Sequence, residues 1–515
     1  MKNVIFVLFV FLISSVSLFA QDIEIGKVFD SEKVLLSENQ LLEGQNGELF
    51  MVGRAYVFLS KKIYIKKFDR ELNLIKENEV KMESQGTPFR MISVFTFKEE
   101  IYILGYPQKG LSTFKLNQES LEFEEEQIIS EKEIAEGDLR TDMSYKLAIS
   151  PNKTKVAIIS VNEGERKNNQ EFVLRVFEKG MKKSWEKKVI VPHRANLLAV
   201  HDTKLDNNGD FYFLTKIYTK PQLTDYLPFG TEQDYSSKLF IFRNKGNEQE
   251  KYPISISGAY VGSSKLTLKS EGNVACIGYY LKKYKKVKKT VGIFYKEIGK
   301  EKKGLIKNIQ SNFSKEVIAS LDKVSKAGTV GKKGTGKDNS LFEVAQLLIS
   351  KDGSIVVVGE NQYTVTKTTT TADGKTNSNT YYDFKDIVAT HITKEGSFKW
   401  SVHIPKNQRG NVYFLDLSVL AFMKGNELNL IYNADKKYLE KENAQYYTNS
   451  KNNIIIQTIV DENGKFKSEE ILEDKKALKD FVVYPFMTDA NKTQVISIFK
   501  KAWKKDTCLF RIKLD

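Results

Sequence analysis

The sequence is poor in cysteine and tryptophan and has no long apolar run after its first 20 residues. Among 515 residues there are two cysteines, Cys276 and Cys508, and three tryptophans. Two cysteines are too few for a disulfide framework, so we expect two buried thiols rather than one bridge, and stability that comes from packing. Without a further apolar run, we expect no integral membrane segment beyond the N-terminal stretch.

Motifs of catalysis and metal binding are also missing. The sequence has no G-x-S-x-G, and none of its four histidines has the spacing of a metal ligand. Residues 331–337 fit G-x-x-x-x-G-K, but Asp338 follows where a phosphate-binding loop needs Ser or Thr, so we interpret this segment as a lysine-rich linker. We predict no catalytic residue, no metal site and no cofactor.

The first residues have the order of a secretory signal peptide. Lys2 precedes an apolar stretch over residues 4–13, and serines and small residues follow up to Ala20. The serines interrupt the apolar run, which favours a cleaved signal over an uncleaved anchor. We expect residues 1–20 to be removed and the chain to be exported to the periplasm or the outside of a bacterial cell.

A strand, a short polar turn and a second strand recur along the chain. "LLEGQNGELFMVG" from Leu41, "LTLKSEGNVACIG" from Leu266 and "LLISKDGSIVVVG" from Leu347 are three of eight such segments. A second hairpin pattern follows, as in "IVATHITKEGSFKWSVHI" from Ile387, so a four-stranded unit recurs roughly every 50–80 residues. The first two strands are almost continuously apolar and the last two alternate with Lys and Glu, which is typical of buried inner and half-exposed outer strands.

This repeat resembles the four-stranded blades of the β-propeller superfamily, and its pattern is similar to NHL-like repeats. No WD dipeptide, kelch double glycine or intact sialidase Asp-box accompanies it. The resemblance implies an all-β chain in which residues 21–515 form one eight-bladed propeller of antiparallel blades. If two degenerate units merge, the count becomes seven.

Two further features of the repeat carry structural predictions. Three units share two glycines six positions apart, as in Gly353 and Gly359. We expect the first glycine to supply a turn conformation forbidden to other residues, and the second to avoid a clash with the neighbouring sheet.

The eighth unit ends one strand short, after "TCLFRIKLD" from Thr507. We predict that residues 22–36 supply the missing strand, which closes the ring and leaves no exposed edge.

In a propeller, the loops between the second and third strands emerge on one face together with the connections between blades. The long segments of this kind are residues 216–237, 281–290, 361–386 and 433–451, and a lysine-rich insertion covers about 310–339. Within the insertion, "SKEVIASLDKV" predicts a short helix after a serine cap. We expect all five segments on the same face, where long loops commonly carry function.

Positive charge is concentrated in these segments. Residues 281–337 contain 17 lysines and four acidic residues, a net charge of +13, whereas the whole chain has +15. This indicates either a solvated lysine surface or a site for a polyanion; nucleic acid is not expected as a partner of an exported chain. Tyrosines in the same loops would stack on sugars or anchor a protein. The candidate binding residues are Lys282, Lys283, Tyr284, Lys285, Lys286, Tyr226, Tyr235, Tyr382 and Tyr446.

Two hypotheses of different classes follow. The first is a non-enzymatic binding or scaffold protein of the bacterial envelope, whose loop face recognises an anionic glycan or a protein partner. The second is a glycan-active hydrolase or lyase with carboxylates in the channel mouth, because propeller enzymes gather such residues from different blades. A cleft with two facing carboxylates, or with a carboxylate and a histidine, would favour the second. We expect His391 and His403, on opposite strands of one outer hairpin, to be packing residues.

Overall fold

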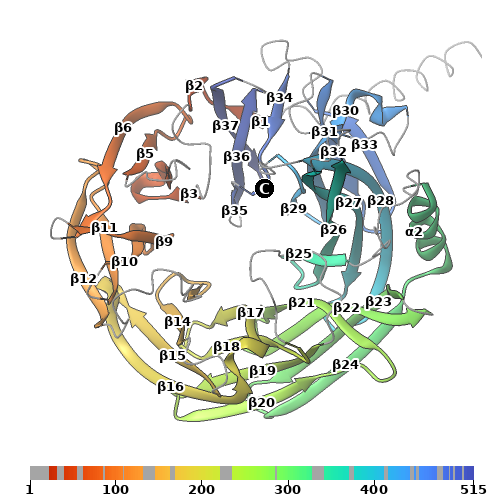
Figure 1. Ribbon diagram of the computed structural model, residues 1–515, viewed down its shortest axis with the longest axis horizontal. Coiled ribbons are helices and arrows are strands. Elements are labelled where there is room, and N and C mark those ends of the chain that lie inside the picture. The colour runs from red at the N-terminus through yellow and green to blue at the C-terminus, as the bar shows by residue number, and fades with distance from the viewer. Residues whose placement is uncertain are drawn as a thin grey trace, which may run out of the picture.

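The strands form eight antiparallel sheets around a central channel, like the blades of a propeller (Figure 1). The structure, a computed structural model, describes residues 23–31, 40–54, 62–84, 87–107, 110–131, 145–162, 169–220, 235–284, 287–327, 342–370, 376–410, 416–440, 446–447, 452–471, 480–486, 488–490, 493–501 and 504–514. The eight-bladed prediction is confirmed over the seven-bladed alternative. In the described part of the chain, no helix combines the length and the apolarity that a bilayer span requires.

Blades one to four follow one another along the chain, each with its first strand innermost. Their strands are β3 (Gln40–Glu43), β4 (Leu49–Arg54), β5 (Lys62–Phe68) and β6 (Leu74–Lys81); β9 (Arg90–Phe97), β10 (Glu100–Tyr106), β11 (Gly110–Leu116) and β12 (Phe123–Glu131); β13 (Tyr145–Ile149), β14 (Val156–Asn162), β15 (Asn169–Glu178) and β16 (Lys182–Arg194); and β17 (Leu198–Leu205), β18 (Phe211–Tyr218), β19 (Tyr235–Arg243) and β20 (Glu248–Ile254).

Blades five to eight complete the ring. Their strands are β21 (Tyr260–Leu268), β22 (Val274–Tyr284), β23 (Val287–Gly299) and β24 (Gly304–Asn312); β25 (Phe342–Ile349), β26 (Ile355–Thr370), β27 (Thr376–Ile392) and β28 (Phe398–Gly410); β29 (Leu420–Lys424), β30 (Glu427–Asp435), β32 (Asn453–Val460) and β33 (Phe466–Glu470); and β34 (Phe481–Val483), β35 (Asp489–Ala490), β36 (Gln494–Lys501) and β37 (Asp506–Lys513) with β1 (Ile23–Ile25) and β2 (Phe29–Asp30).

A few short elements lie outside this scheme. β7 (Glu83–Ser84) pairs with β8 (Thr87–Pro88), and β31 (Tyr446–Tyr447) adds to β28 in parallel. The helical elements are η1 (Gln45–Gly47), η2 (Lys179–Met181), η3 (Ala195–Leu197), α2 (Lys315–Ala327) and η4 (Lys436–Leu439).

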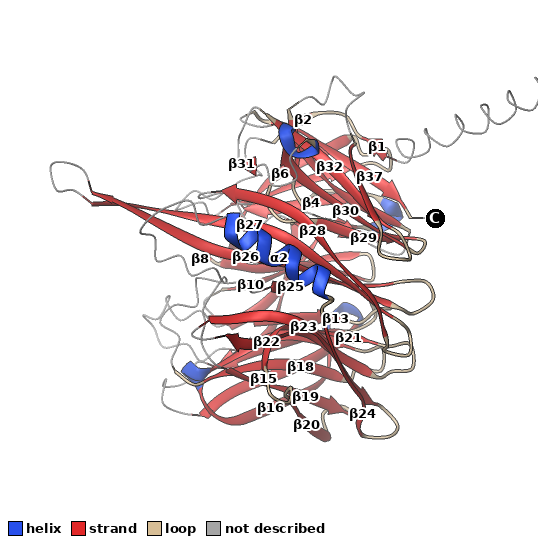
Figure 2. Ribbon diagram, turned by 90° about the vertical axis from the view of Figure 1, so that its right-hand side faces the viewer, coloured by secondary structure: helices blue, strands red, loops and turns tan. Residues whose placement is uncertain are grey.

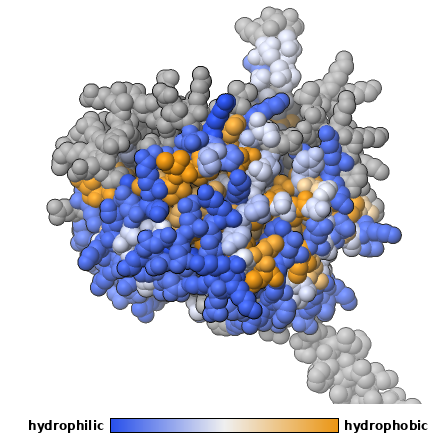
Figure 3. Space-filling view, turned by 90° about the horizontal axis from the view of Figure 1, so that it is seen from below, coloured by the Kyte–Doolittle hydropathy of each residue, from blue (hydrophilic) through white to orange (hydrophobic). Residues whose placement is uncertain are grey.

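The inner strands are buried and the outer strands face water, as the sequence pattern predicts. β18 is buried at six of its eight positions, whereas β20 alternates between exposed and half-buried residues. Figure 3, which looks at the rim that carries β16, β20 and β24, shows a mainly hydrophilic surface with separate apolar patches. Cys276 and Cys508 are free and buried, which confirms the prediction of two thiols.

The two ends of the chain share the last blade. β1 pairs antiparallel with β37, with Ile23 opposite Ile512, and β2 continues the pairing with Phe29 opposite Thr507. The hydroxyl of Thr507 also donates to Ser31 Oγ at 2.6 Å. The predicted closure by the N-terminal segment is therefore confirmed for its described part, and residues 22 and 32–36 lie outside the described residues.

The first glycine of the repeated frame has the predicted role. Gly353 has φ +84° and Gly272 has φ +79°, which lie in the left-handed region that a side chain disfavours. Each follows a turn that a backbone hydrogen bond closes, from Gly353 N to the Ser350 carbonyl at 3.0 Å in blade six.

The second glycine has two different roles. At Gly359, a Cβ would lie 2.1 Å from Tyr279 Oη of blade five, so the predicted clash with the neighbouring sheet is confirmed. At Gly278, a Cβ would instead lie 2.3 Å from the Ser263 carbonyl oxygen of the same blade, where β21 bulges between Val261 and Ser264. For Gly278 the prediction is therefore wrong, because this glycine accommodates an inner-strand bulge of its own blade.

Much of the segment predicted as the loop 361–386 is strand. β26 and β27 extend into a two-stranded ribbon that projects beyond the other described strands (Figure 2). Hydroxyls form a ladder on one face of the ribbon: Thr366 Oγ1 lies 3.2 Å from Thr380 Oγ1, and Thr368 Oγ1 lies 3.1 Å from Ser378 Oγ. The β-branched threonines favour a strand even among Asn, Asp and Gly.

The helix of the insertion forms, but not on the loop face. α2 begins after Ser314, whose Oγ accepts a hydrogen bond from Val317 N at 3.3 Å, as the predicted cap requires. It lies on the outer rim beside β28, where Phe313 and Val317 pack into the core shared by blades five and six (Figure 1). The prediction of one common face is wrong for this helix, because its apolar side needs burial.

Candidate functional site

The tip of the β22–β23 hairpin brings lysines of the predicted binding segment together. In the antiparallel register Lys282 lies opposite Lys289 and Lys283 lies opposite Lys288. Lys282 and Lys283 are exposed, and neither forms an ion pair within the described part of the chain. Like charges directly opposite each other on neighbouring strands are destabilising. We call Lys282, Lys283, Lys288 and Lys289 the lysine hairpin.

An exposed aromatic ring lies beside the lysine hairpin. Tyr260, at the start of β21, is 38% exposed, and Lys288 Nζ lies 4.5 Å from the centre of its ring. A cation over a flat ring offers charge and a stacking plane at one place. The sequence analysis missed Tyr260, because this residue stands at the start of an inner strand and not in a long loop.

The other predicted residues do not all reach the surface. Tyr235 is half-buried in β19 and donates its hydroxyl to the Gly262 carbonyl at 2.8 Å, and burial raises its pKa well above the ordinary value. Tyr382 is half-buried in β27, opposite Gly410 of β28. Outside the described residues lie Tyr226, Lys285, Lys286 and the side chain of Tyr284.

Tyr446 is a structural residue, which corrects its choice as a binding residue. Its side chain is fully buried and donates its hydroxyl to Asp416 Oδ2. Burial raises the pKa of Asp416 to about 6, although the Tyr446 hydroxyl opposes this shift. A ligand at the loop face therefore has no access to Tyr446, whose partner lies 30 residues away in the sequence.

A group of lysines surrounds His201 where blades three, four and five meet. His201 is the extra residue of a bulge in β17, and its buried Nε2 has no hydrogen-bond partner within the described residues. Burial, and then the charges of Lys216, Lys265 and Lys146, hold the pKa of His201 well below its ordinary value. Burial likewise lowers the pKa of Lys216, whose Nζ lies 4.9 Å from the centre of the Tyr235 ring. Asp202 and Glu343 lie near the same lysines and offset part of their charge.

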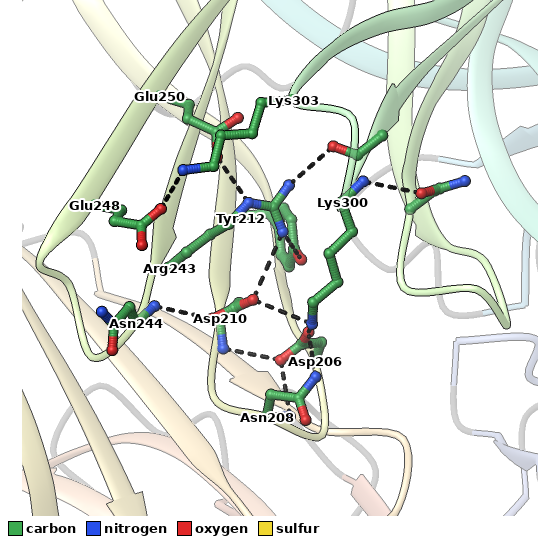
Figure 4. A network of polar contacts seen from close by, with 12 residues as sticks. Asp206, Asn208, Asp210, Tyr212, Arg243, Asn244, Glu248, Glu250, Lys300 and Lys303 are labelled. Atoms are coloured by element: carbon green, nitrogen blue, oxygen red, sulfur yellow. Dashed lines mark hydrogen bonds and ion pairs between the residues drawn. The ribbon is translucent and has the colours of Figure 1, made fainter.

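Acidic side chains gather on the face opposite the lysine hairpin, but lysine and arginine side chains already neutralise them. In the turn between β17 and β18, Asp206 and Asp210 lie 3.0 and 3.3 Å from Lys300 Nζ (Figure 4). Arg243 joins the network by donating to Glu250 at 2.7 Å. Burial lowers the pKa of Lys300, but hydrogen bonds and charge from the two aspartates outweigh it, so the net shift is upward. The ammonium group occupies the place where these carboxylates would hold a metal ion.

A serine, a histidine and an aspartate form a line of hydrogen bonds under α2. Ser320 Oγ lies 2.5 Å from His403 Nδ1, and His403 Nε2 lies 2.9 Å from Asp386 Oδ1. His403 and Asp386 are buried on the outer strands of blade six, so this pair lies away from the channel mouth. The three residues fasten α2 to β28. The second histidine, His391, stacks on Trp400, with 5.5 Å between the ring centres.

A cavity of about 600 Å³ opens from the channel between the inner strands of blades two and three. Leu42 of β3, Val94 of β9 and Leu147 of β13 contribute apolar walls, and Lys153 lies in the turn that borders one end. None of the described residues that line it is acidic or a histidine. The facing carboxylates that the hydrolase or lyase hypothesis requires are therefore not found in the described lining of this cavity.

The fold and the site define an eight-bladed β-propeller that presents paired lysines on its loop face. No model of a known protein family matches the sequence, and no curated protein sequence matches it. Among solved structures, the chain is similar to the Dos1 propeller (9% identity, 95% of this chain and 94% of that chain, TM-score 0.46) and to the polysaccharide lyase Uly1 (8%, 93% and 90%, 0.35). The β-propeller domain of the Trilobed protease from Pyrococcus furiosus is a third (11%, 73% and 98%, 0.31). These likenesses concern the fold alone.

Proposed function

We propose that this chain is an exported, non-enzymatic propeller of the bacterial envelope that binds an anionic glycan through the lysine hairpin. One observation carries the proposal: two lysine pairs stand directly opposite each other at the tip of β22–β23. Each such pair costs stability, about 0.2–1 kcal/mol relative to a neutral pair. A bound polyanion would offset this repulsion at Lys282 and Lys283, which are exposed.

The neighbouring tyrosine supports a glycan over a simple ion. Tyr260 is exposed and its ring has Lys288 Nζ at 4.5 Å, so a sugar stacked on the ring would place its acidic group beside the cation. Export rests on the order of residues 1–20, and N-terminal sequencing of the protein from a periplasmic extract would test it.

The test compares two variants of equal charge on immobilised heparin and polygalacturonate. Lys282, Lys283, Lys288 and Lys289 are replaced by Gln in one variant. In the control, four exposed lysines in turns of the opposite face, which the structure does not pair with carboxylates, are replaced by Gln: Lys245, Lys351, Lys394 and Lys465.

We expect the first variant to bind about tenfold more weakly, because four charge contacts of a few tenths of a kcal/mol each are lost. The control variant should keep its affinity. Equal weakening of both variants would mean that the net charge of the protein, and not the lysine hairpin, determines binding. If the unmodified protein binds neither polymer, the anionic-glycan proposal is wrong and a protein partner is the remaining hypothesis.

A further inference from the structure

The ribbon formed by β26 and β27 has a free edge. β25 pairs with β26 as far as Asn361, opposite Phe342, whereas β26 itself continues to Thr370. Residues 364–370 therefore have β27 on one side, and none of the strands that the structure describes lies on the other. An edge of this kind presents a row of backbone N–H and C=O groups to which a further strand can bind.

The other exposed edges of the propeller are protected by charge, and this one is not. Natural sheets keep foreign strands away from their edges with charged residues and proline. β6 carries four charged residues among eight, and β16 carries six among thirteen. In residues 364–370 of β26 and 376–380 of β27 only Lys367 is charged, and there is no proline. A long edge without this protection is typical of an edge that another strand covers.

The charge of the chain and the position of the ribbon favour a second copy as the partner. Each chain has a net charge of +15, so two copies repel each other unless their contact is nearly neutral. The ribbon offers such a contact and projects beyond the other described strands (Figure 2). Seven residues of strand extend about 23 Å, whereas salt screens charges within about 8–10 Å, so a contact through the ribbons keeps the two propellers beyond strong repulsion.

The order of side chains along the edge also suits pairing with itself. When an edge strand pairs antiparallel with its own copy, residues on the same face of the sheet lie opposite each other, so even-numbered residues always meet even-numbered ones. In β26 these are Thr364, Thr366, Thr368 and Thr370. Every antiparallel register of this edge therefore aligns threonine with threonine, and such pairs across neighbouring strands are favourable.

We propose that two copies of the chain dimerise by antiparallel pairing of residues 364–370 of β26, which joins the two ribbons into one four-stranded sheet. The contact is isologous, because the same segment of both copies forms it. β26 is the pairing strand because its free edge has seven residues, whereas the free edge of β27 has five, residues 376–380. The ribbon belongs to blade six and the lysine hairpin to blade five, so this proposal and the proposed function stand or fall separately.

Sedimentation velocity of the full chain, at concentrations from about 1 to about 200 μM, tests the proposal. A single pair of edges is smaller than a standard protein interface, so we expect a reversible dimer with a Kd of about 10 μM. A chain that stays monomeric over this range overturns the proposal and leaves a strand of another protein as the occupant of the edge. Species larger than a dimer would overturn it as well.

Two variants with the same added charge show whether the ribbon is the contact. Thr366→Lys with Thr368→Lys places like charges on opposite strands of the dimer, and we expect the Kd to rise at least about tenfold. Gln249→Lys with Gln310→Lys adds the same charge at exposed positions of β20 and β24 and should leave the Kd unchanged. Unchanged circular dichroism spectra check that both variants are folded. No loss in the first variant, or the same loss in both, overturns the proposal, and the lysine-hairpin variant should dimerise normally.

Disulfide cross-linking identifies the paired edge. Cys276 and Cys508 are buried, so a cysteine introduced in turn at each of residues 364 to 370 supplies an accessible thiol against an unreactive background. Mild oxidation should give a covalent dimer most readily at one position, with lower yields on both sides, because the two-fold axis brings one residue beside its own copy. Cross-linking only at residues 376–380 of β27, or at none of these positions, overturns the proposal.

Discussion

Two junctions of the ring differ although the blades on either side are built alike. Between blades five and six, Tyr279 is fully buried and donates its hydroxyl to the Val388 carbonyl at 3.1 Å, and Val344 N donates to Ser263 Oγ at 3.0 Å. Between blades two and three the inner strands leave a cavity of about 600 Å³. Further out, blades two and three still share a packed core, so the two junctions differ at their inner strands, which we call sealed between blades five and six and open between blades two and three.

The sealed side of the ring also buries a network of polar groups. Lys406 and Glu360 form an ion pair of 2.6 Å with almost no exposure, and Ser418 Oγ donates to Glu360 at 2.6 Å. Asn433 of blade seven exchanges two hydrogen bonds with Val483 of blade eight, at 2.7 and 2.8 Å. Such groups are costly unless every partner is in place, so blades six to eight should tolerate change poorly.

The largest expected effect is at Gly359, in the sealed junction. Gly359→Ala would place a Cβ 2.1 Å from Tyr279 Oη, and the fully packed surroundings leave little room for the ring to move. We expect a loss of about 3 kcal/mol in unfolding free energy, at the upper end for overpacking. Urea unfolding followed by circular dichroism measures it.

A second substitution checks the cause. In a Tyr279→Leu background the clash is gone, so Gly359→Ala should cost much less there than in the unmodified chain. Equal costs in the two backgrounds would show that the glycine is needed for its backbone and not for the space that Tyr279 occupies.

The next effect concerns pH and the buried carboxyl of the sealed side. Burial raises the pKa of Asp416 to about 6, above the ordinary 3.8 of the unfolded chain. The stability that this carboxyl contributes is therefore present below about pH 4 and is lost as the pH rises through 6, because the unfolded chain ionises first. Asp416→Asn removes the ionisation and should stabilise the protein at pH 8 by about 2–3 kcal/mol.

Urea midpoints of both proteins at pH 4 and pH 8 measure this effect. The advantage of the Asn variant should fall to a small remainder at pH 4, where the Asp416 carboxyl is protonated in the folded protein and is close to its ordinary pKa of 3.8 in the unfolded chain. A variant less stable than the unmodified protein at pH 8 would contradict the assignment. Tyr446→Phe should lower stability at both pH values, because it removes the hydroxyl that donates to Asp416.

Local signals predicted the fold well. The role of a turn glycine such as Gly353 depends on its own backbone conformation and on no distant residue. The need for a strand beside the one that begins near Thr507 follows from counting the strands of each repeat. The ribbon formed by β26 and β27 was predicted as a loop, because the Asn, Asp and Gly residues in its sequence are typical of turns and outweighed the strand preference of threonine.

The sites depended on partners that are distant in the sequence. Tyr446 was predicted as an exposed loop residue, because the sequence does not show that its hydroxyl donates to Asp416. Gly278 was predicted to avoid a clash with the neighbouring blade, because the bulge of β21 in its own blade leaves no sequence signal. The cavity could not be predicted, because its lining comes from strands of three blades whose relative placement no local pattern specifies.

The smallest expected effect tests the comparison most directly, with one substitution at two matched positions. Leu147 of β13 and Leu347 of β25 stand two residues before the end of equivalent inner strands, opposite Ile158 and Val357. Both leucines are half-buried and pack against the core of their own junction, but Leu147 also lines the cavity, which leaves room for a larger side chain. Leu147→Phe should therefore change unfolding free energy by less than about 1 kcal/mol, and Leu347→Phe should cost about 1–2 kcal/mol through overpacking. Urea unfolding of the two variants side by side gives the difference. Equal costs would mean that the junction of blades two and three closes in solution, and the distinction between an open and a sealed side would then be lost.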